Sequence, residues 1–129
     1  MVDSTFVKQG ANSSALVDTF AFSGELVRNN LHFEFTGMHA EAHMDAITLL
    51  KGKTLVDHHT FVDHAVPHCQ SNQLYKGIYD EKSKGVFNGK VMVRKDAQKT
   101  NAFQQNNNLL LSDFSSIDTK PQLEIFADD

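Results

Sequence analysis

Short apolar runs of strand type, separated by turn residues, recur along the chain and limit its fold more than any other feature. Leu31, Phe33 and Phe35 alternate with polar residues, which is the period-two pattern of a half-buried strand. Val91 and Val93 repeat the spacing. The chain has 129 residues, enough for one domain with one core. These runs predict an all-β domain, either a sandwich, a barrel or a solenoid.

The segments between the runs are rich in glycine, asparagine, aspartate and serine, which favour turns. Asn88-Gly89 is the usual signal for a two-residue hairpin, and the same pair can also turn a corner between the strands of a β-helix. The best helix candidate is residues 38–50, which contain several alanines. Its apolar residues do not keep to one helical face for two turns, so strands remain the expectation.

Three further features bear on the core. The ten phenylalanines are expected to anchor it, because the chain has no tryptophan. The run Leu109-Leu110-Leu111 predicts a strand buried on both faces. Amide side chains between Asn101 and Asn108 can form hydrogen-bonded ladders from coil to coil. No exact repeat is visible, but the loose recurrence of strand and turn, with these amides, favours a solenoid.

Charge and composition exclude several classes of protein. The net charge of −4 leaves no basic stripe for nucleic acid. No apolar run reaches the roughly 20 residues that a membrane span needs, and no signal peptide is evident. Cys69 is the only cysteine, so no internal disulfide can form. A single thiol fits a reducing compartment, and we expect the cytoplasm.

Residues 57–69 form the densest polar cluster and contain the types of side chain that bind transition metals. On a strand, His58 and His59 point to opposite faces, whereas His58 and His64 share one face. The candidate metal ligands are His58, His64, His68 and Cys69. No closely spaced cysteine pair accompanies them, so this is not a zinc-finger pattern. Histidines at turns or paired with neighbouring aspartates are the simpler interpretation.

Sequence motifs for catalysis are absent. The chain contains neither GxxxxGK[ST] nor GxGxxG for phosphates, and no GxSxG for a serine hydrolase. Asp57 with Asp63, or Asp128 with Asp129, could serve as the paired carboxylates of a carbohydrate-cleaving β-helix. Acidic turns exposed to solvent are the preferred interpretation. No catalytic residue is assigned, and the chain by itself is predicted not to be an enzyme.

Longer stretches are more specific than any of these motifs. They are Val56-Asp57-His58-His59-Thr60, Asp63 to Gln73, Tyr75-Lys76-Gly77, Val86 to Lys90, Asp96 to Ala102, Asn106 to Leu111 and Lys120 to Asp129. Together they resemble the core of the SufB/SufD family of iron–sulfur cluster assembly proteins, and Ser23 to Leu31 fits more weakly. The segment Lys120 to Asp129 is similar to the SufD branch. Leu109 to Ser116 lacks the cysteine usual in the SufB branch.

The resemblance implies a right-handed parallel β-helix, with residues 1–129 as a single SufB/SufD-type core domain. It implies a non-catalytic scaffold subunit of the SufBCD complex, which pairs with a SufB-like subunit and, together with a SufC-like ABC ATPase, supports iron acquisition and cluster assembly. The N-terminal helical region and the C-terminal SufC-docking region are expected to be absent. The family's Cys/His site lies beyond Asp129, so iron or a cluster is expected only in the assembled complex.

Open coils leave unpaired backbone groups at the ends of a solenoid, so we also expect a homodimer through these edges. No nucleic-acid or membrane partner is expected. The main alternative function is a metal-binding, cupin-like β-barrel enzyme or sensor that uses His58, His64 and His68. A carbohydrate-active β-helix is the third possibility.

Overall fold

The computed structural model describes residues 2–22 and 26–127, and within them it contains nine strands and no helix. The strands are β1 (Val2–Gln9), β2 (Ser14–Ala21), β3 (Leu26–Phe35), β4 (Glu41–Leu50), β5 (Leu55–His64), β6 (Gln70–Tyr79), β7 (Lys84–Val93), β8 (Asn101–Leu110) and β9 (Ser116–Ile125). The weak resemblance at Ser23-Gly24-Glu25 and the proposed carboxylate pair Asp128-Asp129 lie outside the described residues. No described helix exists that could cross a bilayer.

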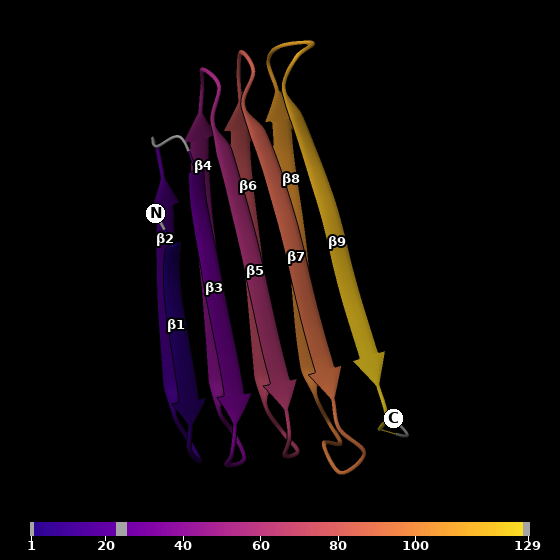
Figure 1. Cartoon of the computed structure of the whole chain (residues 1–129). Helices are drawn as coiled ribbons and strands as arrows, with labels where there is room; N and C mark the ends of the chain where they lie inside the picture. The colour runs from indigo at the N-terminus through magenta and orange to yellow at the C-terminus, as the bar shows by residue number, and fades with distance from the viewer. Residues whose placement is uncertain (1, 23–25, 128–129) are drawn as a thin grey trace.

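The strands form a parallel β-solenoid with two strands in each turn. Odd-numbered strands make one sheet in the order β1-β3-β5-β7-β9, called sheet A here, and even-numbered strands make sheet B in the order β2-β4-β6-β8. Every pairing is parallel. Figure 1 shows the two sheets as two layers, with β1 and β9 at opposite edges of sheet A. The all-β prediction and the parallel β-helix that the resemblance implies are confirmed.

The turns of the solenoid have nearly constant length, so equivalent residues stack at regular intervals along the sequence. On sheet A, Leu26 pairs with Leu55 and Leu55 pairs with Lys84, in two steps of equal length. The pairing of Glu41 with Gln70 on sheet B spans the same length of chain. The step from β1 to β3 is slightly shorter, and the step from β7 to β9 is slightly longer. A repeat therefore exists, although the residue types at stacked positions differ.

The core fills the space between the two sheets with alternate side chains of each strand. On β3, Phe33 and Phe35 are fully buried, and Phe87 on β7 is nearly so. Complete burial of such a side chain stabilises the fold by about 1.5–3 kcal/mol. The expectation that all phenylalanines anchor the core is wrong. Six of the ten are exposed, because they lie on outward positions or in the last turns: Phe6, Phe20, Phe22, Phe103, Phe114 and Phe126.

Asn88-Gly89 makes neither a hairpin nor a corner, because both residues lie in the middle of strand β7. Gly89 faces the interior, where a Cβ atom would lie 2.7 Å from Phe87 Cζ and still closer to Gln104 Nε2. Glycine is needed here because large neighbouring side chains already occupy the interior. Tertiary packing therefore overrides the local turn preference of the pair.

Residues 41–50 form strand β4, as expected from the missing helical stripe, so the helix candidate is excluded. The prediction for the leucine run fails. Leu109, Leu110 and Leu111 are exposed rather than buried on both faces. They lie at the end of β8, and no described strand covers that edge of sheet B. Among the amides, Asn108 Nδ2 donates to Asn106 Oδ1 at 2.7 Å, a bond that runs along the strand rather than from coil to coil.

Candidate functional site

His58 and His64 share one face of strand β5, as predicted, and the structure shows that this face points into the solenoid. The Nε2 atom of His58 is 3.1 Å from Thr48 Oγ1, and the Nε2 atom of His64 is 2.9 Å from Ser71 Oγ. Each bond joins β5 to a strand of sheet B. The Nδ1 atoms of both rings are buried and have no hydrogen-bond partner among the described residues.

Burial lowers the pKa of both imidazoles. For His58, desolvation outweighs the attraction of Asp57 and, with repulsion from His59, lowers the pKa from 6.5 to about 4. For His64, desolvation outweighs the attraction of Asp63 and gives a pKa of about 4. Both rings are therefore neutral near pH 7, and they act as interior hydrogen-bonding groups.

His68 and Cys69 lie at the corner between β5 and β6 and point in different directions. Cys69 is fully buried, and its thiol donates to the carbonyl oxygen of Gly37 at 3.3 Å. Burial raises the pKa of this thiol, which makes it a poor nucleophile. His68 is exposed and stacks on His39, with ring centroids 5.2 Å apart.

The four candidate ligands are thus not brought together. Two face the interior from one strand, one is buried at a corner, and one faces solvent. No group of three or more His, Cys, Asp or Glu side chains converges within residues 2–22 and 26–127. The cupin-like alternative is not favoured, because it needs its histidines at the mouth of a barrel, whereas His58 and His64 are enclosed between two parallel sheets.

The carboxylates of β5 lie on the outer face of sheet A and are occupied by basic partners. Asp57 Oδ1 is 2.8 Å from His59 Nε2. Arg94 donates hydrogen bonds to both carboxylate oxygens of Asp63. Its Nε atom is 2.9 Å from Oδ1, and its Nη2 atom is 2.9 Å from Oδ2. The length of extended strand between the two aspartates is about 20 Å, much farther than a glycosidase pair allows. The carbohydrate-cleaving alternative is therefore not supported at Asp57 and Asp63.

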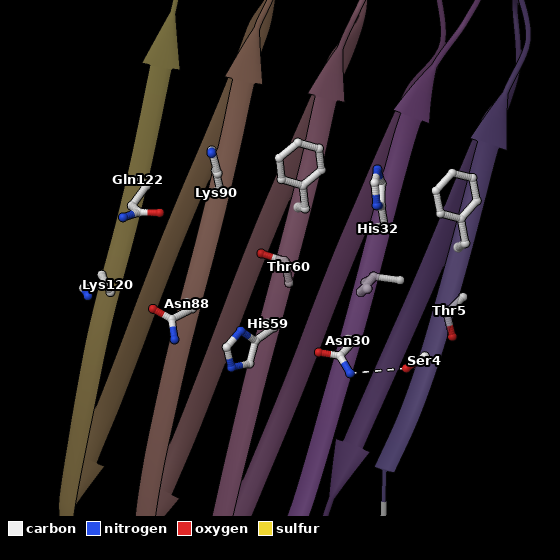
Figure 2. Close-up of a pocket in the computed structure, with 13 residues that line it drawn as sticks. Ser4, Thr5, Asn30, His32, His59, Thr60, Asn88, Lys90, Lys120 and Gln122 are labelled. Atoms are coloured by element: carbon white, nitrogen blue, oxygen red, sulfur yellow. Dashed lines mark hydrogen bonds between the residues drawn. The ribbon is translucent and has the colours of Figure 1, made fainter.

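A shallow groove of about 620 Å³ crosses the outer face of sheet A (Figure 2). Two rows of stacked side chains line it, each row taking one residue from every strand of the sheet. The polar row is Ser4, Asn30, His59, Asn88 and Lys120, and the mixed row is Phe6, His32, Phe61, Lys90 and Gln122. The groove was not predicted from the sequence, although the equal spacing of Asn30, His59 and Asn88 along the chain was a signal for it.

Ring contacts hold the mixed row together. The ring centroids of Phe6 and His32 are 4.5 Å apart, and those of His32 and Phe61 are 4.7 Å apart. Lys90 Nζ lies 5.8 Å from the Phe61 centroid and 3.3 Å from Glu124 Oε1. The groove offers amides, imidazoles and ammonium groups on a rigid sheet, without a nucleophile held by a base. Such an arrangement suits binding rather than catalysis.

Sheet B carries an apolar patch on its outer face, close to the carboxyl ends of its strands. It consists of Phe20, Phe22, Ile47, Leu49, Ile78 and Leu109, all exposed. Register places Ile78 between Leu49 and Leu109, and Phe20 beside Ile47, so the patch is continuous across the strands of the sheet. Contiguous exposed apolar surface of this kind is typical of interaction sites.

Comparison with known families identifies the family of the chain. The family model described as "SUF system FeS cluster assembly, SufBD core domain" matches residues 1–129. The chain belongs to the SufBD family. The resemblance of its sequence to the SufB/SufD core is confirmed.

Several SufBD relatives are similar along nearly all of this chain. The iron–sulfur cluster assembly protein SufD of Escherichia coli is 34% identical over 118 residues, which cover 92% of this chain and 28% of that protein. An iron–sulfur cluster assembly SufBD family protein of Synechocystis sp. is 38% identical over 127 residues, which cover 98% of this chain and 28% of that protein. Protein ABCI7, chloroplastic, of Arabidopsis thaliana is 34% identical over 128 residues, which cover 97% of this chain and 26% of that protein. The chain thus spans little more than a quarter of the length of these SufBD relatives.

Proposed function

We propose that this chain forms the β-helix core domain of a non-catalytic scaffold subunit that pairs with a SufB-like subunit and acts with a SufC-like ABC ATPase. The observation that carries the proposal is the SufBD core-domain match along the whole chain. The function is to support iron acquisition and cluster assembly. In this proposal, iron or a cluster is held only in the assembled complex.

A parallel solenoid suits a scaffold because its inner strands are held by regular backbone pairing with neighbours on both sides. The sheet A groove and the sheet B patch are therefore preformed surfaces that need little ordering when a partner binds. The single buried thiol supports a reducing compartment, which we take to be the cytoplasm.

The edge formed by β8 and β9 is the surface that we propose for a homodimer of this chain. Within the described chain, no strand pairs with the outer edge of β8 or of β9. Leu123 and Ile125 lie at positions that stack on the buried Val91 and Val93, yet both are more than half exposed. Unpaired backbone groups beside apolar side chains favour the addition of strands from another protein.

The test is co-purification of the full-length protein that contains this chain with the SufB and SufC proteins of the same organism. We expect both partners to be retained, and to be lost when residues 1–129 are deleted. A full-length protein that retains neither partner would refute the scaffold function.

A further inference from the structure

A column of residues with positive φ marks the corner that leads into sheet B. Asn12, His39, His68 and Lys99 have φ values of 58°, 64°, 62° and 57°. Each lies two positions before a strand of sheet B begins. Positive φ is uncommon outside glycine, so its recurrence shows that this bend requires it in every turn. The corner therefore stacks four side chains, one from each turn.

Two neighbours in this column are histidines. The rings of His39 and His68 are nearly parallel, at 17°, with centroids 5.2 Å apart, and both side chains are exposed. The backbone next to them is joined directly between their two turns, because Gln70 N donates to Ala40 O at 3.0 Å. The main chain thus holds two imidazoles side by side, facing solvent.

We propose that His39 and His68 chelate one divalent transition-metal ion of the Zn²⁺ type. Imidazole nitrogen is a preferred ligand of such ions and binds zinc at about 2.0–2.1 Å, so two nitrogens on one ion lie within about 4 Å of each other. Small rotations of the exposed rings bring their nitrogens from the stacked arrangement to this separation. The preorganised backbone makes the second imidazole effectively intramolecular once the first has bound.

The rest of the column limits the site to two protein ligands. Lys99 follows His68 and supplies no further imidazole, and Asn12 precedes His39. Water completes the coordination, so the ion remains open to exchange. The site is separate from the buried His58 and His64 and from the thiol of Cys69, which points away from solvent.

Asparagine is a conservative replacement for the two corner histidines. Asparagine already occupies this corner in the first turn, at Asn12, and tolerates positive φ, so His39→Asn and His68→Asn remove the imidazole without changing the backbone requirement. His43→Asn, on the outer face of sheet B, is the matched control that also removes one histidine.

The experiment is titration of the untagged chain with Zn²⁺ by calorimetry, with the imidazole C–H resonances followed by NMR. We expect shifts confined to the rings of His39 and His68, and an affinity about 100-fold weaker in either corner variant, because chelation is lost. His43→Asn should bind as the wild type does. The inference is overturned if the wild type does not bind Zn²⁺, if both corner variants keep wild-type affinity, or if only one of them weakens binding.

Discussion

His58 and Thr48 meet across the interior of the solenoid, with 3.1 Å between the imidazole Nε2 and the hydroxyl oxygen. Nδ1 on the other side of the ring is buried without a described partner. His64 is held in the same way by Ser71. A proton added to either ring would place a positive charge between two packed sheets, where little can solvate it.

Stability should therefore fall in mild acid. Both histidines have a pKa near 4 in the folded chain and 6.5 in the unfolded chain. Between these two pH values the imidazoles are protonated in the unfolded chain but neutral in the folded chain, so acid favours unfolding. The stabilisation is complete above pH 6.5 and is lost as the pH falls toward 4, by up to about 3 kcal/mol for each ring. Urea unfolding at several pH values measures this slope. His58→Gln with His64→Gln should flatten it, and an unchanged slope would contradict the assignment.

Gly37→Ala should destabilise the fold by about 1–3 kcal/mol, because its Cβ would meet the backbone of Ala11 in the preceding turn, with Cα only 2.6 Å away. Backbone cannot rotate aside as a side chain can. Gly10→Ala is the matched control, since nothing lies within 4 Å of a Cβ at that corner. Chemical denaturation of the two variants should separate them, and equal stabilities would show that the turns are less tightly stacked than described.

Cys69 should react slowly with thiol reagents in the native chain. Its side chain is fully buried and its pKa is raised, so little thiolate is exposed near pH 8. We expect modification by a disulfide reagent to be at least about tenfold slower than in urea, because reaction requires local opening of the corner. A native rate equal to the unfolded rate would place this corner among the frayed parts of the molecule.

Self-association through the β8 and β9 edge should be detectable by sedimentation at tens of micromolar. Leu123→Lys places a charge on an exposed apolar position of this edge and should weaken the dimer by about tenfold or more. Gln122→Lys adds the same charge on the outward face and should leave the dimer intact. A wild-type chain that is strictly monomeric at these concentrations would rule out association through the edge.

Local pattern predicted the strands well where one face is apolar, as at Leu31, Phe33 and Phe35, all buried on β3. It failed at Asn88-Gly89, because the glycine is required by neighbours from another turn, Gln104 among them. Stacked interior positions also change type freely. Thr48, Gly77 and Asn108 occupy one column, so the repeat is hidden from a search for similar residues.

The candidate site residues were likewise predicted correctly where local alternation decides, and missed where contacts between turns decide. Alternation alone placed His58 and His59 on opposite faces, and the structure confirms this. Alternation could not say which face is the interior, because both faces of β5 contain polar side chains. The partner of His68 was missed as well. His39 lies a full turn of the solenoid earlier in the sequence, and only the stacking of turns brings the rings together.

The regular register between turns has a consequence for how such a chain can change over time. A side chain in a middle turn touches its counterparts one turn earlier and one turn later, so a larger residue in one turn needs a smaller one at the stacked position of the next. Covariation among homologues should therefore concentrate in a narrow band parallel to the diagonal of the residue-pair map, displaced from it by one turn. Insertions should accumulate at the corners, where an added residue shifts no column of either sheet.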